Sequence, residues 1–204
     1  MSKHDREQPS GSDTMLVDAL SGAVAGAVGV WVMDRVDWAM YRAESPQARQ
    51  RTKRVRPGGL DPAHVLVNRV AGAFGTTLSP PQPHPAGIAV HYSLGIGPGA
   101  LYGAFHDRAP VLGVGRGALF GLGLFLVQDE VVNAATGLSA RPGQYPWQAH
   151  ARGLVAHLVY GLVTDSVLRL LKGLTQPAHQ HQGSGTQRSR RRSPGTIQNL
   201  RQTL

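Results

Sequence analysis

The chain of 204 residues contains no cysteine, which excludes a disulfide framework, a thiolate metal site and a cysteine nucleophile. Charged residues are also scarce, at 16% against about a quarter in average soluble proteins. Aromatic residues make up only 6%. The sequence has no phosphate-binding loop, dinucleotide fingerprint, HExxH pair or GxSxG nucleophile elbow. It therefore indicates no particular enzymatic reaction and no catalytic residue.

The charge that is present is unevenly distributed. The formal net charge is +9, and basic residues gather at 42–56 and 188–201, with nearly uncharged segments between. Neither basic cluster contains an aromatic side chain on which a base could stack, so both favour anionic lipid headgroups over nucleic acid. Residues 1–14 and 173–204 are polar with little to bury, and we expect them to be disordered tails.

Four apolar segments lie between these tails, at 15–33, 86–105, 111–132 and 150–171. Each is close to the ~20 residues that cross a bilayer as a helix. A soluble bundle would show a polar stripe on each helix, whereas these segments contain stretches that are apolar or glycine on every face. A signal peptide is the alternative for the first segment, but no clear cleavage site follows it. We therefore expect an all-α domain at 15–172, a bundle of four transmembrane helices.

Glycines recur at four-residue spacing in three of the apolar segments. Small residues at this spacing form a column along one helix face and let two helix backbones approach closely in lipid. The sequence therefore predicts helix packing through glycine columns. Their members are Gly22 and Gly26; Gly95, Gly99 and Gly103; and Gly113, Gly117 and Gly121.

The segment 43–85 is rich in proline and reads as a loop with one short amphipathic helix. Asp61 is a capping residue, Pro62 suits the first helical position, and apolar residues recur up to Phe74. We expect this helix to lie on the membrane surface or to cap the bundle. Trp31, Trp38 and Tyr41 are expected at the interface as an aromatic anchor.

Ionisable residues in the four spans fall mainly on one side. The ends of the first and third spans and the starts of the second and fourth share a leaflet. His91 would lie about 8 Å inside the second span, and His157 about 10 Å deeper than His150. Ionisable groups in spans are costly and usually mark a functional site or a pairing. The opposite side has fewer histidines at depth, and its ionisable residues are Asp18, His106, Asp107, Arg116 and Asp165. The candidate cluster is Asp34, Asp37, His91, Asp129, Glu130, His150 and His157.

Three chemistries suit this cluster, beside the plain alternative that each residue hydrogen-bonds a neighbouring helix or ends a span. Carboxylates and imidazoles can handle protons or a cation. Alternatively, His91, His157, Asp129 and Glu130 could hold a metal ion, or the two histidines a haem. The default expectation is no cofactor. A separate hypothesis involves none of these chemistries: the chain is a non-catalytic structural partner in a membrane complex.

The order of several motifs resembles a known family. Gly22-x-x-Ala25-Gly26 is followed by His91-Tyr92, Gly117-x-x-x-Gly121, Pro146-Trp147 and His157-Leu-Val-Tyr-Gly161. Over residues 15–172 this order is similar to the YagU-like family of bacterial inner-membrane proteins, a domain of unknown function. The resemblance implies a small multi-pass inner-membrane protein without an established reaction, with His91 and His157 as the best-matched site positions. The first functional hypothesis is that the polar cluster handles protons or a cation in envelope or stress homeostasis. The expected partners are lipid and either a second copy or another membrane protein, not nucleic acid.

Overall fold

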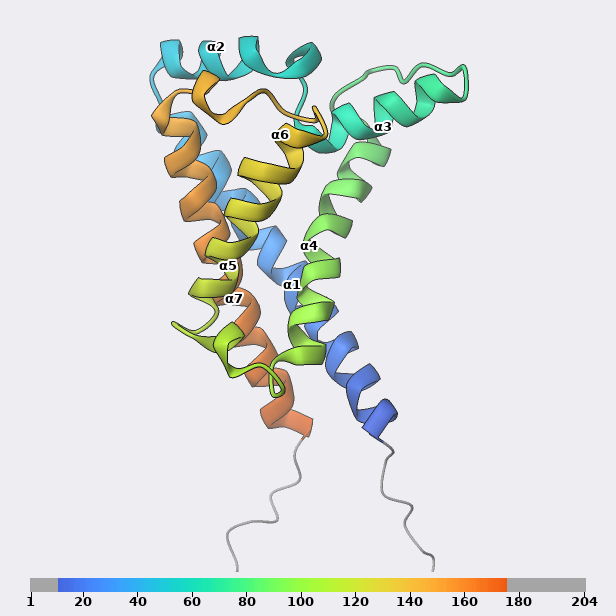
Figure 1. The fold of residues 1–204 in the computed structure, drawn as a ribbon, viewed down its shortest axis with the longest axis vertical. Helices are drawn as coiled ribbons and strands as arrows, with labels where there is room; N and C mark the ends of the chain where they lie inside the picture. The colour runs from blue at the N-terminus through green and yellow to red at the C-terminus, as the bar shows by residue number, and fades with distance from the viewer. Residues whose placement is uncertain (1–10, 176–204) are drawn as a thin grey trace, which may run out of the picture.

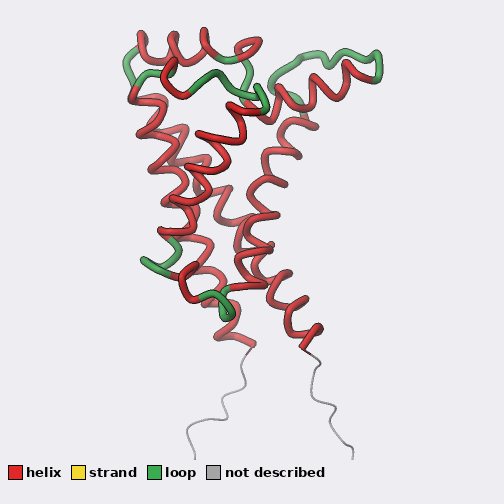
Figure 2. The backbone as a smooth tube through the Cα atoms, viewed as in Figure 1, coloured by secondary structure: helices red, strands yellow, loops and turns green. Residues whose placement is uncertain are grey.

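The computed structural model describes residues 11–175, and all its regular structure within that range is helical. Long helices run between two ends of the molecule (Figure 1) and are joined by loops at both (Figure 2). They are α1 (Gly11–Ala43), α4 (Pro85–Phe105), a third helical rod and α7 (Trp147–Thr175). The rod consists of α5 (Ala118–Leu124), the π-helix η3 (Phe125–Val132) and α6 (Asn133–Ala135). The all-α prediction is confirmed for these residues.

Two short helices cover one end of the bundle, which we call the α2–α3 end. They are α2 (Pro46–Val55) and α3 (Pro62–Ala73), with a short 3-10 turn η1 (Pro57–Gly59) between them. Both described termini lie at the other end, which we call the terminal end (Figure 1). The end of α1, the start of α4, α6 and the start of α7 therefore meet at the α2–α3 end.

Three helices are long and apolar enough to cross a membrane: Thr14–Ala43, Ala118–Ala135 and Trp147–Leu174. The fourth expected span, 86–105, does form a 21-residue helix, α4, which packs along α1. Its five glycines, Pro98 and His91 lower its hydropathy, so α4 is not among the three.

The expected third span is wrong at its beginning. Residues Pro110–Gly113 form a 3-10 turn, and the helix starts only at Ala118. Gly115, Arg116 and Gly117 all have positive φ angles, which a right-handed helix does not accommodate. Gly113 consequently lies in a turn, and a Cβ added there would meet only the side chains of Arg169 and His106. The expectation that Gly113 belongs to a helix-packing column is wrong.

Glycines bring α1 and α4 into backbone contact. A Cβ atom at Gly99 would lie 2.6 Å from the Cα of Gly26 and 2.7 Å from the carbonyl oxygen of Gly22. Gly103 makes the same kind of approach to α1, whereas a Cβ at Gly95 would lie 2.7 Å from the Cβ of the Val30 side chain. Each is closer than a real Cβ can come, so only glycine fits. The α1–α4 interface therefore runs along the expected columns.

A second close approach joins α5 to α7. Cβ atoms at Gly117 and Gly121 would collide with the backbone of α7 at Gly161 and His157. A Cβ at Gly161 would in turn lie 2.9 Å from the amide nitrogen of Gly121. Gly161 was not among the expected packing glycines, because no glycine stands four residues from it in α7.

The segment 43–85 is more helical than expected. The helix after Asp61 forms as α3, and the Asp61 carboxylate accepts a hydrogen bond from the His64 amide at 3.0 Å. The remainder was expected to be loop, but Pro46–Val55 forms α2 because Ser45 caps it and Pro46 starts it. The tail expectations also need adjustment at their inner ends, since 11–14 and 173–175 are helical. The rest of both tails lies outside the described residues.

Candidate functional site

The seven residues of the expected cluster lie at the α2–α3 end, on four different elements. α1 carries two of the carboxylates and continues nine residues past Asp34 to Ala43, so these carboxylates lie within a helix rather than at its end. η3 carries the other two. π-helical turns widen the helix and occur often at functional sites. The structure divides the seven residues into separate pairs and does not gather them into one cluster.

His91 joins α4 to α1. Its Nε2 atom lies 2.8 Å from Oδ1 of Asp34. Both side chains are partly exposed, at 39% and 34%. The pair is therefore accessible from outside the bundle while it connects two helices.

His157 faces the interior from α7. Its Nδ1 atom lies 2.9 Å from the Gly153 carbonyl oxygen and 3.7 Å from Oδ2 of Asp129. A carbonyl can only accept, so Nδ1 carries a hydrogen and donates it. In the neutral ring, Nε2 is then an acceptor. Asn133 lies 3.4 Å from the other oxygen of Asp129 and helps to orient this carboxylate on η3.

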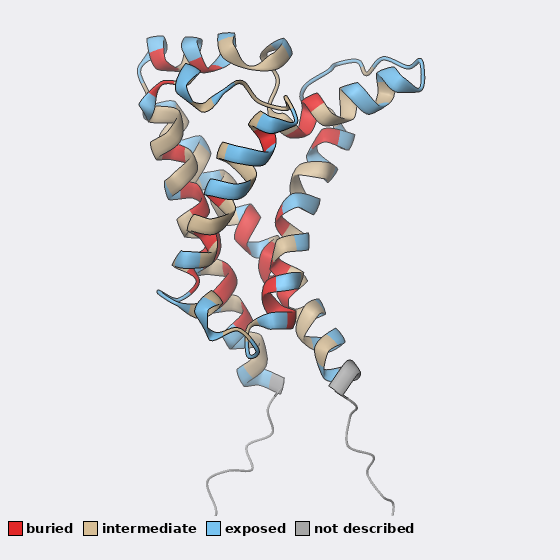
Figure 3. Cartoon of the chain, viewed as in Figure 1, coloured by how far each residue is buried: buried red, intermediate tan, exposed pale blue. Residues whose placement is uncertain are grey.

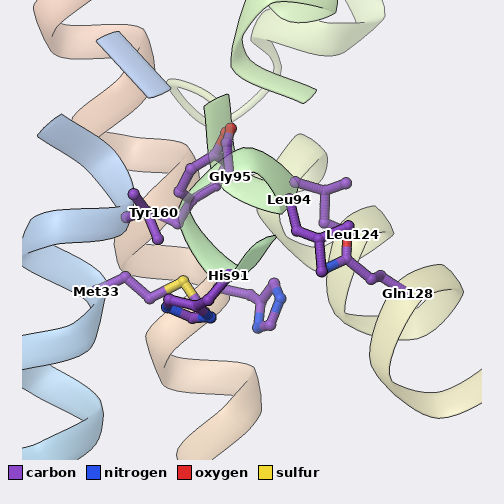
Figure 4. Close-up of a pocket in the computed structure, with 9 residues that line it drawn as sticks. Met33, His91, Leu94, Gly95, Leu124, Gln128 and Tyr160 are labelled. Carbon is purple, nitrogen blue, oxygen red and sulfur yellow. The ribbon is translucent and has the colours of Figure 1, made fainter. Parts of the chain in front are cut away.

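His91 and His157 line the same small cavity. Its wall also includes Gln128 from η3, Met33 from α1 and Tyr160 from α7 (Figure 4). The volume of about 30 Å³ is enough for one or two water molecules. Tyr160 donates a hydrogen bond across the cavity wall to the Gly95 carbonyl at 2.5 Å. The site thus places two imidazoles from different helices beside a space that water can fill.

The other candidate residues at this end form interhelical ties. His150 is held by Oε1 of Glu130 at 2.7 Å and by the Pro142 carbonyl at 3.0 Å. Asp37 accepts a hydrogen bond from Nε of Arg152 at 2.9 Å. Arg152 is only 5% exposed and also pairs with Glu44. Arg152 is not among the residues expected in the site, although an arginine inside the fourth apolar segment was the available signal.

The structure does not support the metal and haem hypotheses. In the range 11–175 no three His, Asp or Glu side chains come together in a way that could hold a metal ion. The four expected ligands split instead: His91 pairs with Asp34, His157 lies near Asp129, and Glu130 binds His150. The cavity between the two histidines is also far too small for a porphyrin.

A second polar network lies at the terminal end. Its centre is Asp165, which is fully buried on α7. One carboxylate oxygen accepts from the Tyr102 hydroxyl at 2.6 Å and lies 3.2 Å from Nε2 of His106. The other accepts from Nε of Arg169 at 2.7 Å. Sequence reasoning placed His106, Asp107 and Asp165 on this side without linking them. The pairs Tyr102–His106 and Asp165–Arg169, each four residues apart, were the missed signal.

This network continues to the surface through Asp107. The carboxylate lies 2.7 Å from the Lys172 ammonium and 2.8 Å from Nδ1 of His106. Hydrogen bonds from Lys172, and then from His106, lower the pKa of Asp107 below its ordinary value. Lys172 also lies 3.3 Å from Asp18 of α1, so three elements meet here.

An Asp107→Asn variant is expected to show a small loss of stability, no more than about 1 kcal/mol, because the carboxylate is 62% exposed. A lowered carboxyl pKa contributes stability above the unfolded-state pKa, and that stability is lost as the pH falls through the folded-state value. The loss caused by the substitution should therefore be constant from pH 8 to 5 and vanish in strong acid. Thermal unfolding in detergent measures it. A difference that grows on acidification would contradict the assignment.

Comparisons with protein-family models, with curated proteins and with solved structures found no match to this chain. The resemblance to the YagU-like family therefore stays a prediction.

Proposed function

We propose that this chain is a multi-pass membrane protein in which α1, α4, the α5–α6 rod and α7 are four spans. The distribution of side chains supports this. Large apolar residues point outward, among them Leu20 and Val24 on α1, Leu126 on η3 and Leu170 on α7. The interior holds glycines and polar groups beside a small set of apolar residues such as Ala25 and Leu168, and the buried positions follow the helix contacts (Figure 3). Large apolar residues outside and close backbone packing inside suit a helix bundle in lipid.

The α2–α3 end has the features of a membrane interface. Trp38 and Trp147 are 56% and 72% exposed there, as expected of aromatic residues at headgroup level. α2 turns Ala48 and Thr52 inward and leaves Arg51, Lys53 and Arg54 exposed. Anionic lipid headgroups are the partner proposed for this basic surface. A bacterial inner membrane is the proposed location.

Membrane extraction tests this part of the proposal. The protein should sediment with membranes, remain there in high salt and at alkaline pH, and dissolve only in detergent. Release by salt alone would contradict the proposal and favour binding to nucleic acid, whose phosphate contacts are sensitive to salt.

We infer further that the cavity between His91 and His157 is a proton-binding site. One observation carries this: two imidazoles from different helices line one water-sized cavity, and each has a carboxylate beside it. Imidazole is the side chain that changes charge near neutral pH, and a buried water with polar neighbours can link two such groups. Proton binding needs only these residues, whereas the metal and haem hypotheses each need a bound group as well.

Nitrogen NMR of the histidine rings in lipid nanodiscs tests the site. The ring-nitrogen signals of His91 and His157 should change together with pH, and Asp34→Asn should alter the response of both because they share the cavity. His150→Gln is the matched control, since His150 is bound to Glu130 and Pro142 outside the cavity. Independent responses of the two rings, or His157 signals that do not respond to pH, would contradict a shared site.

A further inference from the structure

The terminal-end network lies outside the proposed site and has its own connection to the surface. Buried Asp165 contacts His106, His106 contacts Asp107, and Asp107 is 62% exposed. Two charged residues of α7 flank these three groups. Arg169 pairs with Asp165, and Lys172 pairs with Asp107. At the other end of the bundle, the partly exposed Asp34–His91 pair connects the cavity to the surface. At each end of the bundle, titratable groups therefore extend from the protein surface to the interior.

The inner face of α7 joins these two polar regions. His157, Tyr160 and Thr164 follow one another at helical spacing, Asp165 comes directly after Thr164, and all four are buried. The Thr164 hydroxyl is fully buried, packs against Gly29 of α1 and makes no hydrogen bond. A fully buried hydroxyl without a hydrogen bond destabilises the fold. Thr164 therefore leaves an unused polar group between the two regions.

Phe120 of α5 separates the two regions in this structure. Its ring centroid lies 4.6 Å from that of Tyr102, which binds Asp165, and 6.0 Å from that of Tyr160, which lines the cavity. Phe120 also packs against the buried cluster of Ala25, Tyr102 and Leu168. An apolar ring thus stands between the tyrosines of the two polar regions.

We propose that the inner face of α7 is a passive proton path from one end of the bundle to the other, closed in this structure by Phe120. The proposal rests on the proton-binding site proposed above, which would form one half of the path. A proton taken up at His91 and Asp34 passes through cavity water to His157. When Phe120 moves aside, hydroxyl groups and entering water carry it past Thr164 to the Asp165–His106 pair. It leaves through Asp107, and no other reactant is consumed.

Proton flux into liposomes tests the path. The protein is reconstituted with a trapped pH dye, and a potassium gradient with valinomycin drives protons inward. Phe120→Ala should raise the flux about tenfold, equivalent to lowering the barrier by about 1.4 kcal/mol. Phe105→Ala, which removes an exposed aromatic ring from α4, is the matched control and should leave the flux unchanged.

A second substitution shows whether the added flux follows α7. Thr164→Val keeps the shape of the side chain but removes its hydroxyl. The double variant Phe120→Ala, Thr164→Val should therefore lose most of the flux gained by Phe120→Ala alone. Phe120→Ala with Asp165→Asn should do the same. Flux that survives both second substitutions would overturn the path, because the leak would run elsewhere.

Equal flux in folded Phe120→Ala and Phe105→Ala proteins would also overturn the path. If Phe120→Ala does not fold, Phe120→Leu, which keeps most of the apolar volume, decides in its place by the same comparison. Histidine titration of the same samples separates the two proposals. If His91 and His157 respond to pH together but no added flux is seen, only the path is refuted. If the two rings do not respond to pH, the proton-binding site is refuted as well.

Discussion

Gly99→Leu is expected to separate α1 from α4 and to prevent the bundle from folding, whereas Gly97→Leu on the same helix is tolerated. A Cβ at position 99 would lie 2.6 Å from the Cα of Gly26, and backbone atoms cannot move aside without displacing a whole helix. At position 97 a Cβ would meet nothing within 4 Å. Overpacking usually costs about 1–3 kcal/mol, and a clash between two backbones should exceed that range.

Yield and gel filtration in mild detergent, together with circular dichroism on heating, measure this difference. Gly121→Leu and Gly123→Leu repeat the comparison at the α5–α7 interface. A Cβ at 121 would collide with the α7 backbone, and one at 123 would meet nothing within 4 Å. If Gly99→Leu were as stable as Gly97→Leu, α1 and α4 would not pack through their glycines. The paired design removes the effect of leucine itself, since both members of a pair add the same side chain.

The glycine interfaces were largely predictable because a four-residue spacing determines which helix face a residue occupies. Gly22, Gly26, Gly95, Gly99 and Gly103 all lie at the α1–α4 contact. Spacing alone does not show whether a segment is helical, and this explains the error at Gly113. The positive φ angles that follow it interrupt what reads in sequence as one apolar run. Gly161 was not predicted because no glycine stands four residues from it in α7.

For the polar residues, the sequence predicts the end of the bundle at which each one lies but not the side chain that it contacts. Chain order alone places His91, Asp129 and His157 at one end, because antiparallel helices bring alternate ends together. Which carboxylate each histidine meets depends on the rotation of each helix, and the sequence does not contain that directly. Asp165 was underrated for a related reason. One of its partners is the hydroxyl of Tyr102, which reads in sequence as part of an apolar span.

Arg152→Met is expected to destabilise the protein by about 3–5 kcal/mol, because it leaves a buried carboxylate without its partner. Arg152 pairs with Asp37 and Glu44, and its guanidinium lies 5.0 Å from the centroid of the Tyr41 ring. The side chain of Glu44 is 6% exposed, and its second oxygen is buried without a hydrogen bond. Asp37, at 41% exposed, can turn to solvent, whereas Glu44 cannot. Thermal and denaturant unfolding in detergent measure the loss.

The charge explanation is checked by a double-mutant cycle. Glu44→Gln in the Arg152→Met background removes the unpaired charge and should recover most of the lost stability. If the double variant is as unstable as the single one, packing of the arginine stem on Tyr41 is the cause instead. The ion pair also holds the last turns of α1 against α7. Because α1 carries Asp34, and α7 carries His157, loosening this contact should change the shared titration of His91 and His157 even where the helices remain folded. Arg152 would then maintain the cavity without lining it.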